Sequence, residues 1–242
     1  MNKIKEENLE ESKIHKHEID MTSGSVLKKM LLFSFPLMGS SILQLLFNAA
    51  DIIVIGKFAG DNSLAAVGAT ASLINLLVNL FVGLAIGANV LTARYYGAKR
   101  DEDISRTVHT SIALSIVCGT GLAVIGILIS KPILAMMGTP DEILPLSTIY
   151  MQIYFAGMPA MMIYNFGSAV LRAKGDTARP LVYLAIAGVL NVGLNLFFVI
   201  ALKMDVEGVA SATSISQCLS ALPQQRAGCL PAGEKAFKDS WA

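Results

Sequence analysis

The sequence predicts an all-α membrane protein, a bundle of about six transmembrane helices. Of its 242 residues, 54% are hydrophobic and only 15% are charged. A soluble chain of this length needs more polar surface to cover itself. The charges also gather in short segments that separate long apolar runs, and about 20 apolar residues are enough to cross a bilayer. These features together indicate a polytopic membrane protein in contact with lipid.

Six apolar runs follow one another along the chain. They span approximately residues 31–55, 64–93, 107–130, 146–171, 180–202 and 206–222. The sixth run falls short of the ~20 residues that a membrane helix needs. Residues 132–145 contain three prolines and are expected to form an interfacial loop or a short helix.

The polar segments suggest three regions and an orientation. Residues 1–28 form a polar tail, residues 29–221 the six-helix lobe, and residues 222–242 a second polar tail that fits no helical pattern. Loops on the side of the N-terminus carry seven basic residues, against three in the other loops. The seven are Arg94, Lys99, Arg100, Arg106, Arg172, Lys174 and Arg179. The positive-inside rule therefore predicts a multi-pass protein of the plasma (inner) membrane with a cytoplasmic N-terminus.

One acidic residue, Asp51, lies inside the first apolar run. Gln44 and Asn48 precede it at helical spacing, so all three project from one face of the helix. A carboxylate at the centre of a membrane helix costs roughly 2.5–3.5 kcal/mol on insertion scales. No basic residue is expected at the depth of Asp51, which predicts an ion- or proton-binding site facing the protein interior, with Gln44 and Asn48 as an additional polar face.

The fifth and sixth runs supply polar partners at the same depth. At 1.5 Å per residue, Asn191, Asn195 and Thr213 all fall in the same outer half of the bilayer as Asp51. Carboxylate, amide and hydroxyl oxygens are hard ligands for a small cation such as Na⁺, and the same acid can instead take up and release a proton. For the two asparagines and the threonine, hydrogen bonds between helices, worth about 0.6 kcal/mol each, are an equally weighted alternative.

Other patterns carry less functional information. Gly83 and Gly87 form a G-x-x-x-G that is expected to support close helix packing. No basic stripe with interleaved aromatic residues indicates a nucleic-acid partner. An intramembrane enzyme needs a H-E-x-x-H or a Ser/His pair within the membrane, and His109 stands at a helix end, so we expect no enzyme. We expect no organic cofactor, and no metal beyond Na⁺ at Asp51.

Several stretches in order along the chain resemble the multidrug and toxic compound extrusion (MATE) antiporters, specifically their N-terminal lobe. The matching stretches are residues 22–36, 47–56, 64–68, 94–98, 171–176 and 208–213. The similarity covers approximately residues 22–221. It implies twelve helices in two pseudo-symmetric lobes, which export cationic or amphipathic compounds in exchange for Na⁺ or H⁺.

The resemblance also assigns roles to individual residues. Asp51 matches the first-helix acid of the cation site, and Pro36 matches the proline at which that helix bends. Asn191 and Thr213 match partners of the acid on the fifth and sixth helices. Asn195 stands where many members of the family have a second acid, which leaves the choice between Na⁺ and H⁺ open.

No second lobe follows the sixth run, and residues 222–242 resemble nothing in the family. A truncated or frame-shifted gene is the first interpretation. The alternatives are a half-transporter that pairs with itself or with another lobe, a non-transporting remnant, and a related flippase of lipid-linked oligosaccharides. The sequence does not identify the substrate, because the substrate cavity requires residues from both lobes.

Overall fold

The computed structural model describes residues 26–221, and both polar tails fall largely or wholly outside this range. Helix α2 (Val26–Val54) begins three residues before the expected start of the lobe at residue 29. The remaining described elements are helical as well. They are η1 (Ile55–Ala59), α3 (Asp61–Gly97), α4 (Asp101–Met136), α5 (Leu144–Ala156), α6 (Met158–Ala173), α7 (Ala178–Leu196), η2 (Phe197–Ala201) and a helix over residues 206–221.

The apolar helices have the dimensions of membrane spans. Four described helical segments are long and apolar enough to cross a bilayer, or up to five if the bent pair of α5 and α6 forms one span. The described part of the sixth run is helical over residues 206–221. The described part of the chain contains no strand. The all-α membrane class predicted from composition is therefore confirmed.

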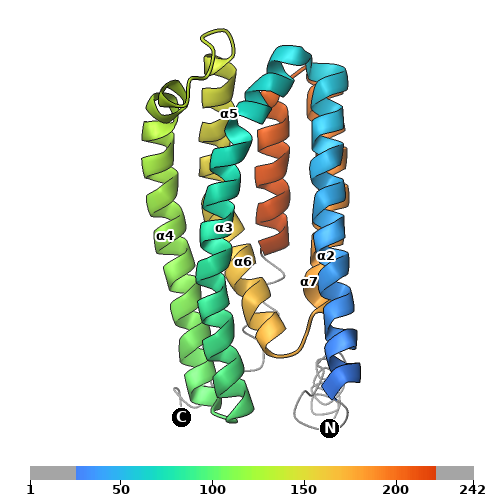
Figure 1. Ribbon diagram of the computed structural model, residues 1–242, viewed down its shortest axis with the longest axis vertical. Coiled ribbons are helices and arrows are strands. Elements are labelled where there is room, and N and C mark those ends of the chain that lie inside the picture. Colours follow the sequence, from blue (N-terminus) through green and yellow to red (C-terminus); the bar gives the residue numbers. More distant parts are fainter. Residues whose placement is uncertain (1–25, 222–242) are drawn as a thin grey trace, which may run out of the picture.

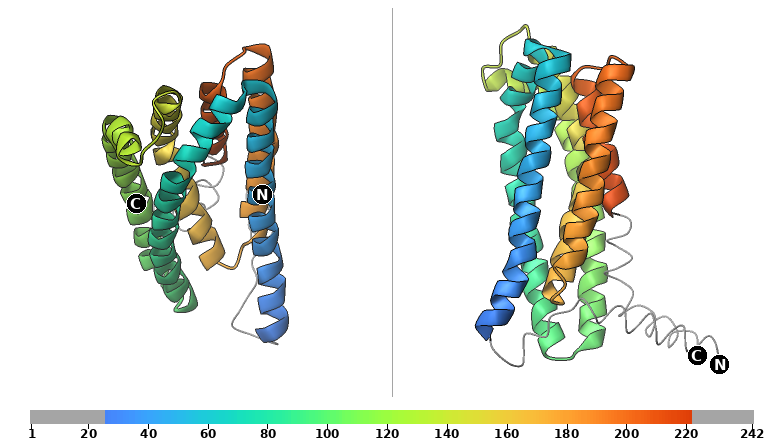
Figure 2. Two further views of the ribbon diagram at one scale, coloured as in Figure 1. Left: turned by 45° about the horizontal axis from the view of Figure 1, so that its top comes forward. Right: turned by 90° about the vertical axis from the view of Figure 1, so that its right-hand side faces the viewer.

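The helices form two packed groups (Figure 1). Helices α3, α4, α5 and α6 pack on one another, and α2 packs on α7. The helix over residues 206–221, red in Figure 1, lies between the groups, and the left view of Figure 2 shows the same separation. Phe81, Met158 and Phe166 belong to the largest buried cluster, which lies within the first group. The α2–α7 pair joins the rest of the bundle through η1, which packs on α3, and through the helix over residues 206–221, whose Thr213 accepts a hydrogen bond from Asn191.

Helices α2 and α7 run parallel, because successive contacts ascend both helices together. A side-chain carbon added to Gly39 would lie 3.7 Å from Leu181. One added to Gly188 would overlap the ring of Phe47. Residues of the first and fifth apolar runs therefore meet at matching heights, as the depth argument from sequence requires.

The fourth apolar run, predicted as one helix over residues 146–171, is broken. Helices α5 and α6 meet at Gly157 with a bend of 48°. Pro159 in the first turn of α6 lacks the amide hydrogen that a continuous helix would use. A side-chain carbon on Gly157 would lie 2.6 Å from the hydroxyl oxygen of Ser214, so the break also admits the helix over residues 206–221.

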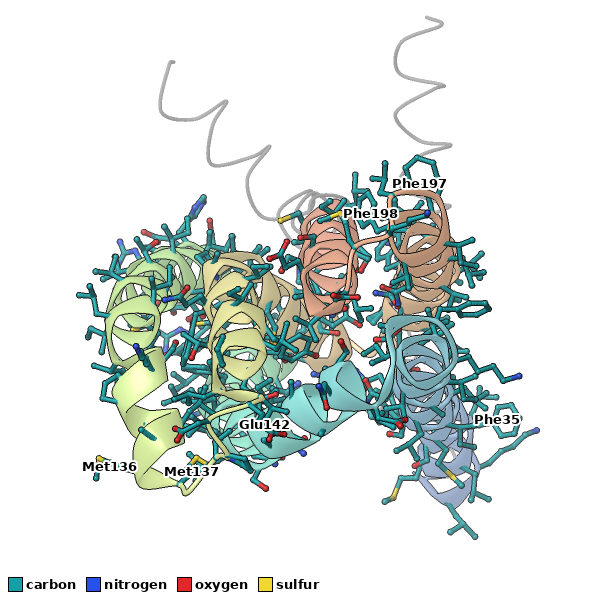
Figure 3. The ribbon with its side chains drawn as sticks, turned by 90° about the horizontal axis from the view of Figure 1, so that it is seen from above. Phe35, Met136, Met137, Glu142, Phe197 and Phe198 are labelled. Carbon is teal, nitrogen blue, oxygen red and sulfur yellow. The ribbon has the colours of Figure 1, made fainter. Side chains whose placement is uncertain are left out.

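The third run extends further than expected. Helix α4 continues through Pro132 to Met136, so the predicted loop over residues 132–145 begins only after Met136. The labelled side chains of Phe35, Met136 and Phe197 point away from the bundle (Figure 3), and they are 78%, 87% and 54% exposed. Large apolar side chains on the outside are what a lipid-facing surface requires.

The glycines divide into two sets. Gly126 packs so closely that an added side-chain carbon would overlap the ring of Phe155, whereas Gly83 and Gly87 have nothing within 4 Å of that position. The described part of the chain therefore gives the G-x-x-x-G of α3 no helix to pack against, contrary to the expectation. The close approaches of helices occur at isolated glycines instead.

Candidate cation site

Three helices bring the predicted polar residues together. Asp51 lies in the last turn of α2, Asn191 and Asn195 lie one turn apart on α7, and Thr213 lies on the helix over residues 206–221. The parallel packing of α2 on α7 places Asp51 and Asn195 at the same height. The four residues come from three separate apolar runs, so only the tertiary fold unites them.

A continuous chain of hydrogen bonds links these four residues. The side-chain amide of Asn195 donates to a carboxylate oxygen of Asp51 at 2.5 Å and to the amide oxygen of Asn191 at 3.3 Å. The amide of Asn191 donates to the hydroxyl of Thr213 at 3.2 Å, and Thr213 donates to the backbone carbonyl of Val209 at 3.0 Å. Donation therefore starts at Asn195 and runs two ways, to Asp51 on one side and through Asn191 to Thr213 on the other.

This network leaves one buried oxygen without a donor. Asn195 is completely buried, and both acceptors near it face its amide nitrogen, so its orientation is fixed by its neighbours. Its amide oxygen, Oδ1, has no hydrogen-bond partner. A buried polar atom without a partner costs about 1–3 kcal/mol. Such an atom beside a carboxylate is suited to a positively charged ligand or to an added proton.

The chemistry of the site follows from its oxygens. Asp51 supplies two carboxylate oxygens, and Asn195 supplies the unpartnered amide oxygen. Oxygen donors of this kind suit hard cations. The hydroxyl of Thr213 already accepts one hydrogen bond and donates another, so its main role is to hold Asn191 in place.

An apolar layer lies one helical turn from the site. Val54 follows Asp51, Val199 follows Asn195, and Val209 precedes Thr213 by three or four residues each. These three valines pack together with Ile55 in one buried cluster. The layer therefore lies between the carboxylate and the end of the bundle that carries η1 and η2.

The other predicted site residues lie outside the network. Gln44 and Asn48 share the face of Asp51 by spacing but are exposed in this chain. Pro36 lies within α2, which continues as one helix on both sides of it. The hydroxyl of Ser40 donates to the carbonyl of Pro36 at 2.9 Å.

The sequence analysis missed two contributors to the site. Gly188 lies one turn before Asn191, and its lack of a side chain lets Phe47 enter the α2–α7 contact. The signal for Gly188 in the sequence was its position three and seven residues before the two asparagines, which places it on the same face of the helix. Tyr150, which stacks on Tyr154, lies within electrostatic range of Asp51. No local pattern marks it, because it comes from α5.

The fold and the buried polar site together define a multi-pass helical membrane protein with a carboxylate in its interior. The MatE family model matches residues 36–197 of the chain. This match covers more than half of the sequence and includes Asp51, Asn191 and Asn195. The chain belongs to the MATE family.

Relatives of known sequence agree with this assignment. The probable multidrug resistance protein YoeA of Bacillus subtilis (strain 168) is 33% identical over 196 residues, which are 79% of this chain and 42% of YoeA. The probable multidrug resistance protein YpnP of the same organism is 31% identical over 203 residues, 84% of this chain and 46% of YpnP. The chain thus spans less than half the length of these relatives.

Solved structures of the family share the arrangement of helices. A crystal structure of MATE in the bent conformation superimposes with a TM-score of 0.78 at 28% identity, and the match covers 84% of this chain and 45% of that one. A crystal structure of MATE in the straight conformation gives a TM-score of 0.77 at 28% identity, covering 82% and 44%.

Proposed function

We propose that this chain is the N-terminal half of a cation-coupled antiporter that exports drugs and other xenobiotics, with Na⁺ or H⁺ as the coupling ion. The observation that carries the proposal is the unpartnered amide oxygen of Asn195 beside the carboxylate of Asp51. A site built only for stability would satisfy that oxygen. The names of YoeA and YpnP, both probable multidrug resistance proteins, support export of drugs as the activity.

The coupling step in this proposal is a change of charge at Asp51. Binding of Na⁺ or a proton neutralises the carboxylate and gives the free oxygen of Asn195 a partner. An ion biases a conformational equilibrium only through its different affinities for the two states. Helices α2 and α7 pack mainly on each other and little on α3–α6, so this pair is the element that shifts in the proposal, with Pro36 as the site of a bend in α2.

A second lobe, or a second copy of this chain, is the proposed partner. Gln44 and Asn48 on α2, and Asn75 and Asn79 on α3, are exposed amides within membrane spans. Amides facing hydrocarbon are costly, so this surface is better covered by protein or by an aqueous cavity than by lipid. A cavity for cationic or amphipathic substrates would form there. The proposed location is the plasma membrane, with the N-terminus in the cytoplasm.

The test is transport by the full chain reconstituted in vesicles. Vesicles are loaded with a fluorescent cationic compound, and an inward gradient of Na⁺ or of protons is imposed. We expect gradient-driven export by the wild type and its loss in Asp51→Asn, which keeps the shape of the side chain and removes its charge. Asp141→Asn is the matched control, because Asp141 is an exposed acid in the α4–α5 loop.

Two outcomes would contradict the proposal. Undiminished gradient-driven export by Asp51→Asn would exclude Asp51 as the coupling residue. The wild type would instead be identified as a non-transporting remnant if it exported nothing alone. The same absence of export would have to persist after addition of a separately expressed C-terminal lobe from a relative.

A further inference from the structure

A cavity of about 420 Å³ lies between α3 and α4, remote from the cation site. Its volume falls in the range of small-molecule sites. Phe166 of α6 forms its back wall, and its other lining residues come from Leu84–Tyr95 of α3 and Asp103–Leu114 of α4. These ranges form the lower ends of α3 and α4 in Figure 1, where the two helices are joined.

The polarity of the cavity changes along its length. The end near the α3–α4 turn carries the guanidinium of Arg106 and the carboxylate of Asp103. The hydroxyls of Thr110 and Ser111 follow one turn deeper, and beyond them the wall is apolar. From Tyr95 to Leu84 the cavity extends about 16 Å along α3, which is about half of a ~30 Å hydrocarbon core.

The missing side chain at Gly87 explains why the cavity exists. Gly87 lines it and has nothing within 4 Å of the position that a side-chain carbon would take. Within residues 26–221 no helix packs against Gly87, which therefore leaves a groove about one leaflet deep. Its walls deeper in the membrane include Leu91 and Leu114.

The charges favour a phosphate at the polar end. Asp103 is already paired with Arg100 at 2.6 Å. Arg106 contacts Glu102 at 2.6 Å, but both side chains are largely exposed, and such surface pairs contribute little and exchange readily. A guanidinium has five N–H donors and can therefore bind a phosphate while it keeps this contact. Residues 94–106, which include the adjoining turn, carry four basic and three acidic side chains, so the polar end has a net charge of +1.

We propose that this cavity binds one glycerophospholipid of the adjacent leaflet. Arg106 binds the phosphate, the hydroxyls of Thr110 and Ser111 donate to the ester oxygens, and one acyl chain lies over Gly87 between Leu91 and Leu114. A phospholipid has its phosphate outermost, then its ester groups, then its hydrocarbon chains. This order matches the order of these residues along the membrane normal. Basic residues in the turn attract anionic lipids in particular.

The test is lipid binding to the purified full chain, measured by native mass spectrometry after removal of bound lipid. Phosphatidylglycerol is titrated, with diacylglycerol as the analogue that lacks the phosphate. Gly87→Leu fills the apolar part of the cavity, and Arg106→Gln removes the phosphate partner. Gly121→Leu and Lys131→Gln are matched controls, because neither residue lines the cavity, Gly121 also has open space around it, and Lys131 is exposed near the opposite end of α4.

We expect the Kd of the first phosphatidylglycerol to rise about tenfold or more in both cavity variants and to stay unchanged in both controls. Diacylglycerol should bind wild type and Arg106→Gln alike. A photoactivatable phospholipid should label peptides covering residues 84–95 and 103–114 in the unaltered protein, a result that does not depend on the folding of any variant.

Three results would overturn the proposal. Equal phosphatidylglycerol binding by Gly87→Leu and Gly121→Leu would place the lipid elsewhere. Equal affinities of the wild type for phosphatidylglycerol and diacylglycerol would exclude phosphate recognition. If Gly87→Leu abolished the binding of a cationic probe such as tetraphenylphosphonium but left phospholipid binding intact, the cavity would be assigned to a substrate.

Discussion

Replacing Asn195 by alanine removes the central link of the buried network. The substitution deletes hydrogen bonds to Asp51 and to Asn191 and leaves the Asp51 carboxylate without the donor that the structure shows. A hydrogen bond to a charged group contributes about 1.5–3 kcal/mol, whereas neutral bonds within membranes average about 0.6 kcal/mol. The charged bond dominates, so we expect Asn195→Ala to lower the free energy of unfolding by about 2–3 kcal/mol.

The assay is thermal unfolding in detergent followed by circular dichroism. At about 2–4 °C per kcal/mol for a chain of this size, Tm should fall by about 4–12 °C. Asn79→Ala is the matched control, since the amide of Asn79 is exposed and donates only to a carbonyl of its own helix. Added Na⁺ or a lower pH should raise the Tm of the wild type and not that of Asn195→Ala, because only a ligand of the folded state stabilises it. Equal Tm values for Asn195→Ala and Asn79→Ala would refute this energetic role.

Two further substitutions probe the frame of the site. Gly188→Leu should force the ring of Phe47 out of the α2–α7 contact and abolish the effect of Na⁺ or pH on Tm. The control Gly121→Leu should leave that effect on Tm intact. A normal response of Tm to Na⁺ or pH in Gly188→Leu would show that the close approach of the helices is dispensable. Arg179→Ala should lower the free energy of unfolding by about 3–5 kcal/mol, because it breaks a 3.0 Å ion pair with Asp176, whose carboxylate is almost completely buried. Chemical denaturation with urea measures this change, and a loss below about 1 kcal/mol, the value typical of exposed pairs, would contradict it.

The main elements and the core of the candidate site were predictable from sequence. Apolar run length located the membrane helices, because the bilayer imposes that length on every span. Depth counting placed Asp51, Asn191, Asn195 and Thr213 together, and the structure brings all four into one hydrogen-bonded network. This inference succeeded because a membrane fixes the height of each residue, and the rise of a helix is constant.

The remaining features depend on which helices face each other, and one sequence does not specify that. Gly157 is approached closely by Ser214, which comes from a helix more than fifty residues later. Gly83 and Gly87 have the spacing of a packing motif, but no helix among the described residues covers them. Gly188 carries no such motif and still makes one of the tightest contacts. Small residues therefore indicate that two helices can approach closely. They do not indicate at which position the helices do so.

The central claim is that Asp51, held by Asn195, is the residue at which the coupling ion binds. The most direct measurement is calorimetric titration of the purified full chain with Na⁺ and, in the absence of Na⁺, with acid. We predict one saturable binding event in the wild type and in Asp141→Asn, and none in Asp51→Asn. Indistinguishable isotherms for the three proteins, for Na⁺ and for protons alike, would contradict the claim.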